Sequence, residues 1–266
     1  MVRLASILVS LTSFACIAAA QGTALVDAPP VPSSSEQAQI IQQTRSIARE
    51  YSENLPNFIC TQTVQRSARA KSGQSWKLDD TLILDVAYSD KGESYRLLSI
   101  NGKPTKKSYA QIRGAKSDFD FGSILEWIFR EKSEALFQWE RWTNLRGRPA
   151  YVFSYHVDQS HSQFHMRASK FHMIAAFGGL VYVDRETNRV MRITYAPSAI
   201  PSDWPITGLS SELDYGLASI GEQQVFLPLH AQLIVTGRIG YQSRNVMDFG
   251  NYRKFSAEAT LKFEKE

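Results

Sequence analysis

Alternation of apolar and polar side chains runs through most of this chain and restricts it to a β-rich fold. Over residues 76–88 the larger apolar side chains occupy every second position, among them Leu82, Leu84 and Val86. Residues 255–263 repeat the pattern. A period of two places alternate side chains on opposite faces of a strand, so each segment predicts a strand with one dry face.

Turn signals divide the rest of the alternating sequence into further strands. We expect strands over residues 95–100, 137–141, 151–157, 180–183, 190–195 and 224–236. Asn101–Gly102 and Arg146–Gly147–Arg148 predict turns, and Asn188 can take a left-handed backbone in the turn over 184–189. Pro228 has no N–H to donate, so it predicts an edge or a bulge in its strand.

Two segments follow a helical period instead. Ser33 and Glu36 fit a capping box, and apolar residues at helical spacing follow as far as Leu55–Pro56. Residues 121–130 predict a short interior helix, with Asp120 as its N-cap. Two helices with roughly nine to eleven antiparallel strands make an α+β fold, and a sheet of that width curls because its strands twist.

The N-terminal residues indicate export. Arg3 supplies a basic start, and the run from Leu4 to Ala20 carries no charge and ends in three alanines. This is the pattern of a secretory signal peptide, too short to span a bilayer well. We expect cleavage near Ala20 and a periplasmic or secreted protein with no integral membrane segment afterwards. Lipidation at Cys16 stays an alternative.

The expected domain organisation is a signal peptide over 1–20, a Pro/Ala-rich linker over 21–32 and a single domain over 33–266. The net charge of +4 gives no strong field for nucleic acid. Once Cys16 has left with the signal, Cys60 has no partner for an intramolecular disulfide. Its apolar neighbours favour a buried strand position.

Two stretches carry a family resemblance. Residues 145–153 hold a Gly-Arg-x-Ala turn that opens a strand, and residues 179–193 hold a strand ending in Asp184, an acidic-Thr turn and a further strand. The pair resembles the outer-membrane lipoprotein carrier (LolA-like) superfamily and its relatives, the periplasmic regulators of anti-sigma factors. The whole chain is also similar to exported proteins of soil bacteria. The sequence departs from the carrier pattern over residues 156–177 and at Trp204–Pro205.

The resemblance implies a curled antiparallel half-barrel whose helices close its concave side. Members of the superfamily hold acyl chains or protein partners there and perform no chemistry. On such a fold the expected ligand-binding residues are Trp76, Ile124, Leu125, Ile128, Phe129 and Trp139. The helix over 121–130 would be a lid or a plug. A filled core is the competing interpretation, because small barrels usually pack solid.

Three further clusters invite a functional interpretation. His156, His161, His165 and His172 lie close in the sequence, and imidazole groups bind zinc or copper, but their spacing matches no standard zinc motif. Residues 118–123 lack most of the ligands of a calcium loop. A basic stretch could meet phospholipid headgroups or keep a sheet edge from pairing; it consists of Lys103, Lys106, Lys107, Arg113 and Lys116.

Motifs of hydrolases, zinc proteases, thiol oxidoreductases and P-loop enzymes are absent from the sequence. We therefore expect a non-enzymatic exported binding protein, without catalytic residues, metal or cofactor, that holds a lipid, an acylated protein or another apolar ligand. Two alternatives stay open. One is an envelope protein–protein interaction module with a filled core, and the other is a metal-dependent enzyme at the cluster over His156–His172.

Overall fold

The computed structural model describes residues 29–89, 92–116 and 121–255. By its internal contacts the chain divides into residues 1–30 and Val31–Glu266, and the helices and strands below belong to the second unit. The expected signal peptide and most of the linker lie outside the described residues. So do residues 118–120, with Asp120 among them, and the alternation over 256–263.

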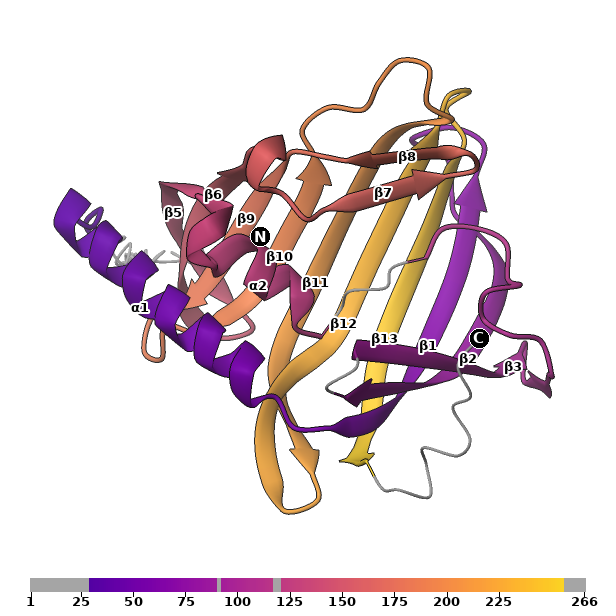
Figure 1. Ribbon diagram of the computed structural model, residues 1–266, viewed down its shortest axis with the longest axis horizontal. Helices are drawn as coiled ribbons and strands as arrows, with labels where there is room; N and C mark the ends of the chain where they lie inside the picture. The colour runs from indigo at the N-terminus through magenta and orange to yellow at the C-terminus, as the bar shows by residue number, and fades with distance from the viewer. Residues whose placement is uncertain (1–28, 90–91, 117–120, 256–266) are drawn as a thin grey trace, which may run out of the picture. The chain divides into compact units, whose positions relative to one another are not determined.

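An antiparallel sheet of 11 strands dominates the described part of the chain, in the order β4-β3-β2-β1-β13-β12-β11-β10-β9-β6-β5 (Figure 1). Its strands are β1 (Phe58–Arg69), β2 (Lys77–Ser89), β3 (Gly92–Ile100), β4 (Lys103–Pro104), β5 (Leu136–Leu145), β6 (Arg148–Val157), β9 (Phe177–Asp184), β10 (Val190–Pro197), β11 (Ile206–Ile220), β12 (Gln223–Gly237) and β13 (Gln242–Lys254). The edges β4 and β5 do not pair, so the sheet curls without closing. This confirms the α+β curled half-barrel.

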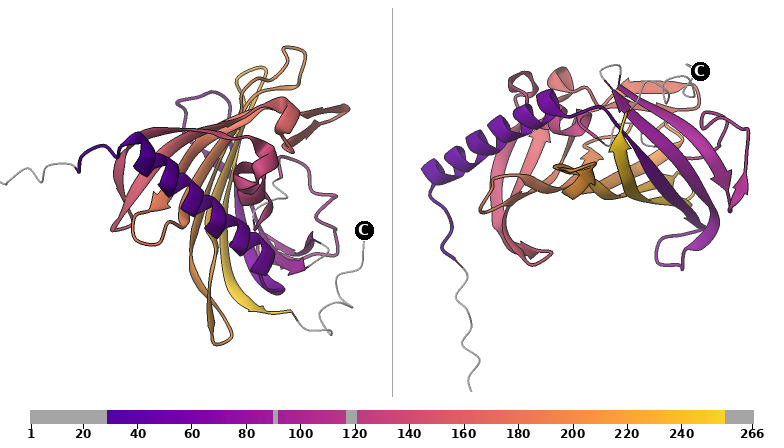
Figure 2. Two further views of the ribbon diagram at one scale, coloured as in Figure 1. Left: turned by 60° about the vertical axis from the view of Figure 1, so that its left-hand side comes forward. Right: turned by 90° about the horizontal axis from the view of Figure 1, so that it is seen from below.

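A separate hairpin lies on the hollow side of the sheet. It consists of β7 (His165–Ala168) and β8 (Phe171–Ile174), within the long connection between β6 and β9. Two 3-10 turns, Glu131–Ser133 and Gln159–His161, complete the short elements of the described residues. Figure 2 shows the hairpin and both helices on one side of the curled sheet.

Helix α1 (Ser34–Asn54) begins at the predicted capping box. Ser33 N–H donates to Glu36 Oε2 at 2.7 Å, and Glu36 N–H donates back to Ser33 Oγ at 3.4 Å. Ile40, Thr44 and Ala48 form its buried face.

Helix α2 (Ser123–Phe129) confirms the interior helix but is shorter than predicted, and Gly122 stands at its N-cap without a side-chain bond. The predicted cap, Asp120, lies outside the described residues. The two helices meet where Tyr51 Oη donates to Phe121 O at 3.0 Å.

The predicted alternation corresponds to burial on the hollow side. Leu82, Leu84 and Val86 are fully buried, whereas Leu78 at the start of β2 is exposed. Pro228 pairs with Tyr215 of β11 next to a register shift, as at a bulge, and it lies beyond the pairing of β12 with β13, which begins at His230. Asn188 has the predicted left-handed backbone, with φ of 52°. Cys60 is a free, buried cysteine, as expected.

Candidate functional site

A cavity lies between the β7–β8 hairpin, residues 114–116 and the hollow face of strands β10 to β13. We call it the hairpin cavity; its volume is about 590 Å³. Its apolar walls are Phe164, Met166, Tyr195, Ile206, Leu209, Leu233 and Val235. Its polar lining residues are Lys116, His165, Arg167, Ser169 and Ser243. Apolar walls with a small set of polar groups suit a ligand that is mostly apolar and carries a polar end.

Aromatic packing holds the hairpin over this cavity. At its base the ring of Phe164 lies 5.5 Å from Phe177 and 5.7 Å from Tyr195. Near its tip Phe171 lies 5.8 Å from Trp204. Within β7 the side chain of Met166 is buried while its neighbours on the strand are exposed, since successive side chains point to opposite faces. The hairpin thus presents an apolar inner face to the sheet.

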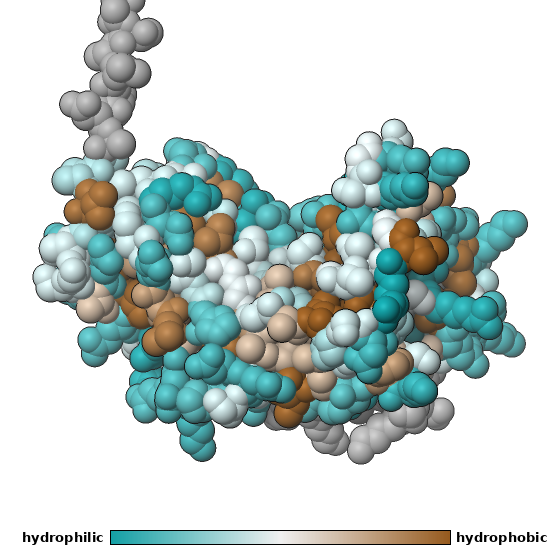
Figure 3. Space-filling view, turned by 90° about the horizontal axis from the view of Figure 1, so that it is seen from above, coloured by the Kyte–Doolittle hydropathy of each residue, from teal (hydrophilic) through white to brown (hydrophobic). Residues whose placement is uncertain are grey.

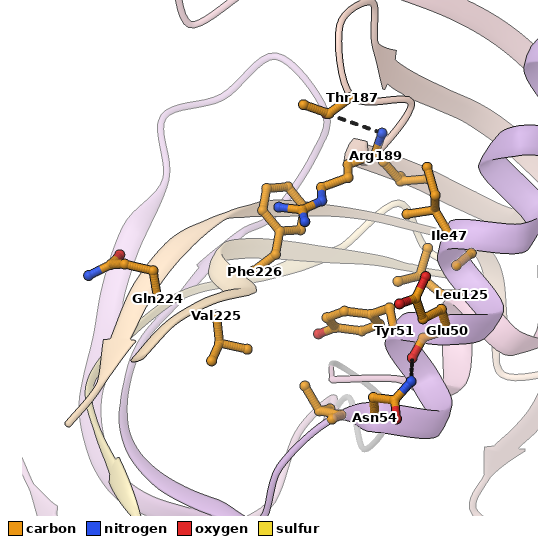
Figure 4. Close-up of a pocket in the computed structure, with 13 residues that line it drawn as sticks. Ile47, Glu50, Tyr51, Asn54, Leu125, Thr187, Arg189, Gln224, Val225 and Phe226 are labelled. Atoms are coloured by element: carbon orange, nitrogen blue, oxygen red, sulfur yellow. Dashed lines mark hydrogen bonds between the residues drawn. The ribbon is translucent and has the colours of Figure 1, made fainter. Parts of the chain in front are cut away.

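A second cavity lies between the C-terminal half of α1, α2 and the end of the β11–β12 hairpin (Figure 4). We call it the helix cavity; its volume is about 480 Å³. Tyr51 extends across it from α1 toward Val225, and the Phe226 ring lies beside the Arg189 side chain. The Arg189 guanidinium lies 5.7 Å from the Phe226 ring centre. Burial, with smaller contributions from Tyr88 and Glu93, raises the pKa of Tyr51 far above its usual value, so its phenol stays a neutral hydrogen-bond donor.

The predicted ligand residues of α2 are packed inside the protein. Ile124, Ile128 and Phe129 are buried in the core, and Leu125 borders the helix cavity. The Phe129 ring stacks on Phe137 with centroids 5.5 Å apart. In this arrangement the α2 face fills part of the hollow, and its contact with a ligand stays a prediction.

The two predicted tryptophans lie apart from α2 and from each other. Trp76 has two guanidinium groups over its ring, with Arg69 at 4.2 Å and Arg244 at 4.6 Å from the ring centre. Trp139 lies in β5, 5.3 Å from Trp142 and 5.4 Å from Phe153 between ring centres. The six predicted residues therefore occupy three separate places, and none of them lines the hairpin cavity.

Sequence reasoning missed the hairpin cavity because residues 156–177 look like a polar connection. A short signal was present: Phe164, Met166 and Ala168 alternate with His165 and Arg167. Five alternating residues predict a strand with one apolar face.

The histidines of that connection do not assemble into one site. His156 lies 3.1 Å from Asp158, and the His161 ring lies 3.6 Å from Glu134. His165 Nδ1 and His172 Nε2 are 3.2 Å apart across the hairpin. Over the described ranges no group of three or more His, Cys, Asp or Glu side chains stands close enough to hold a metal ion.

No protein-family model matches the sequence, and no curated protein matches it. Three solved structures are similar over most of their length. One is a LolA superfamily protein from Nitrosomonas europaea, with 11% identity, a TM-score of 0.37, and 86% of this chain and 97% of that chain covered.

The second is a DUF1329 family protein from Desulfovibrio piger, with 10% identity, a TM-score of 0.36 and coverage of 84% and 97%. The third is an outer membrane lipoprotein-sorting protein domain from Vibrio parahaemolyticus, described as putative, with 10% identity, a TM-score of 0.34 and coverage of 84% and 95%. The chain is similar to LolA-type proteins. None of its described helices has both the length and the apolarity of a membrane-crossing segment.

Proposed function

We propose that this is a non-enzymatic exported protein, periplasmic or secreted, which holds a lipid, an acylated protein or another apolar ligand on the hollow face of its curled sheet. The observation that carries the proposal is the hairpin cavity, a space of about 590 Å³ with apolar walls drawn from both the sheet and the β7–β8 hairpin. Export rests on the pattern of residues 1–20.

The size and chemistry of the hairpin cavity fit this role. Ligand pockets in proteins range over about 300–1,000 Å³ and are mostly apolar. A ligand chain that buries about 300 Å² of apolar surface gains about 7 kcal/mol at about 25 cal/mol per Å², before the cost of ordering it. Such binding selects for apolar shape more than for a particular headgroup.

The test is ligand capture by the purified protein. Native mass spectrometry of gently purified protein should show co-purifying lipid, and the protein should take up the apolar dye Nile red. Leu209→Trp places a large ring in the hairpin cavity, so dye affinity should fall by about tenfold or more. Leu217→Trp is the matched control, on the same strand at a side chain that is 59% exposed.

Native mass spectra without bound lipid, together with no uptake of Nile red, would overturn the proposal. Equal dye affinity in the two tryptophan variants would also overturn it, because the dye would then bind elsewhere. The buried face of α2 favours an interaction module with a filled core as the second candidate function, and an empty, dye-free protein is the result that candidate expects.

A further inference from the structure

Three loops meet at one end of the sheet, and we call this end the rim. It comprises the β1–β2 turn (residues 70–76), the β12–β13 turn (238–241) and the β10–β11 loop (198–205), with the strand residues next to them. Arg69 Nε donates to Gln242 Oε1 at 2.7 Å, and Arg238 Nη1 donates to Trp204 O at 3.3 Å. Asn245 Nδ2 donates to Ala115 O at 2.8 Å, which joins residues 113–116 to the rim.

The rim exposes large apolar side chains. Ile239 is 88% exposed at the tip of the β12–β13 turn, and Tyr241 is 45% exposed beside it. Leu78, at the start of β2, is 62% exposed. Figure 3 looks onto this end and shows apolar residues standing among hydrophilic ones. Transfer of a protruding isoleucine side chain from water into an apolar phase is favourable.

The rim is also basic. Its exposed or half-buried cations are Arg69, Lys71, Lys77, Arg113, Lys116, Arg238 and Arg244. The acidic residues of the same described segments are Asp79, Asp80 and Asp203, and Asp80 is already bonded to Arg66 at 2.7 Å. At the opposite end of the sheet the turns mix both signs, with Glu186 and Glu222 among arginines. Positive charges thus outnumber negative ones at the rim, by seven to three among these residues.

Trp76 combines the apolar and the basic character of the rim. Its ring makes cation–π contacts with Arg69 and Arg244, and Arg244 projects from the face of β13 opposite Asn245 and the cavity. Tryptophan and tyrosine favour the headgroup layer of a bilayer, and arginine pairs with phosphate.

We propose that the rim docks on an anionic lipid surface, with Ile239 and Tyr241 entering the interface and the surrounding cations facing phosphate groups. Apolar side chains at turn tips, with cations in the same loops and the adjoining strand ends, match a lipid interface better than the flat apolar centre of a protein interface. The docking proposal depends on the rim residues alone. A further consequence rests on the proposed function. Because Ser243, Val235 and Ile206 border both the rim and the hairpin cavity, docking would place the entry to that cavity next to the lipid.

The test is sedimentation with vesicles. The chain is expressed in full and purified after export, and its mass shows whether residues 1–20 remain, because that apolar segment would itself bind lipid. Vesicles of phosphatidylcholine with about a third phosphatidylglycerol should bind the protein, and vesicles of phosphatidylcholine alone should bind it at least about tenfold more weakly. Salt should weaken the binding to anionic vesicles, because it screens exposed charges.

Two variants separate the contributions of charge and apolar contact. Lys71→Gln with Lys77→Gln should lower partitioning onto anionic vesicles by about fivefold for each lysine, the usual effect of one cation near such a surface. Ile239→Ser should lower it by a similar factor by removing the protruding side chain. All three side chains are exposed, so thermal melts should match those of the parent protein.

The matched control is Leu217→Ser with Lys254→Gln, an exposed leucine and an exposed lysine at the opposite end of the sheet. It should bind vesicles like the parent protein. Equal binding to neutral and anionic vesicles, a larger loss in the control than in the rim variants, or no sedimentation with either vesicle would each overturn the proposal. Nile red uptake, measured without vesicles, reports on the hairpin cavity separately.

Discussion

Arg148 and Asp184 form a two-bonded ion pair between the start of β6 and the end of β9. Arg148 Nη2 donates to Asp184 Oδ1 at 3.0 Å, and Nε donates to Oδ2. The same carboxylate accepts the backbone N–H of Thr187 at 2.9 Å. The two sequence stretches that carry the family resemblance are therefore held together by one buried carboxylate, whose side chain is 3% exposed.

This pair makes stability depend on pH at the acidic end. The hydrogen bond from Arg148 is the main cause that lowers the pKa of Asp184 to about 2, against an ordinary value of 3.8. Because the pKa is lower in the folded state, the carboxylate contributes stability that is fully present above about pH 3.8 and is lost as the pH falls toward 2. The Arg148 side chain is 47% exposed, so solvent screens the pair. We therefore expect it to contribute about 1–2 kcal/mol to the free energy of unfolding.

Urea unfolding of the parent protein and of Asp184→Asn, measured from pH 5 down to about pH 2, checks this expectation. The parent should lose stability more steeply than the variant below about pH 4. Parallel curves would show that Asp184 titrates alike in the folded and unfolded chains.

Gly179 is expected to be intolerant of any side chain. A Cβ built there would lie 2.0 Å from Thr194 O, and that carbonyl is held in place by Tyr155 Oη, which donates to it at 3.0 Å. Gly179→Ala should therefore lower the free energy of unfolding by about 2 kcal/mol or more. Gly250→Ala is the control, since no heavy atom lies within 4 Å of its Cβ position, and it should change stability by about 1 kcal/mol at most.

The capping box of α1 should contribute measurably to stability. Ser33→Ala removes the acceptor for Glu36 N–H and should lower the free energy of unfolding by about 1 kcal/mol. Gln39→Ala, at an exposed position inside the same helix, should leave it within about 0.5 kcal/mol of the parent. Chemical unfolding of the two variants gives the comparison, and equal losses would rule out a specific effect of the cap.

Helix α2 should stay docked when a ligand binds. Ser133 Oγ donates to Ile128 O at 2.8 Å, and the side chain of Ile128 is fully buried. Hydrogen exchange with Nile red present should slow over residues 164–175 and stay unchanged over 123–129. Faster exchange over 123–129 would identify α2 as a lid, and slower exchange there would place the dye against it.

Ile128→Ala measures how firmly α2 is held. The substitution leaves a cavity in the packed core, so it should lower the free energy of unfolding by about 2–5 kcal/mol. Leu217→Ala, at an exposed position, should change it by less than about 0.5 kcal/mol. A small loss at Ile128 would mean that the space it fills is readily taken by neighbouring side chains.

Local sequence patterns were sufficient for the individual elements. The box at Ser33 and Glu36, the left-handed Asn188 and the dry face of β2 follow from interactions within a few residues or from strict alternation. The positions of Trp76 and Trp139 did not follow from such patterns. Phe153 reaches Trp139 from the neighbouring strand β6, and Arg244 reaches Trp76 from β13, which is separated from β2 by β1.

The sequence by itself determined a wide antiparallel sheet with an N-terminal helix and a short interior helix, because periods of two and 3.6 are written in consecutive residues. Only the tertiary structure decided that the α2 face fills the hollow while the β7–β8 hairpin leaves a space beneath it. An inward side chain has the same hydropathy whether it meets another side chain or an opening. The difference is set by the curl of the sheet and by contacts between residues far apart in the chain.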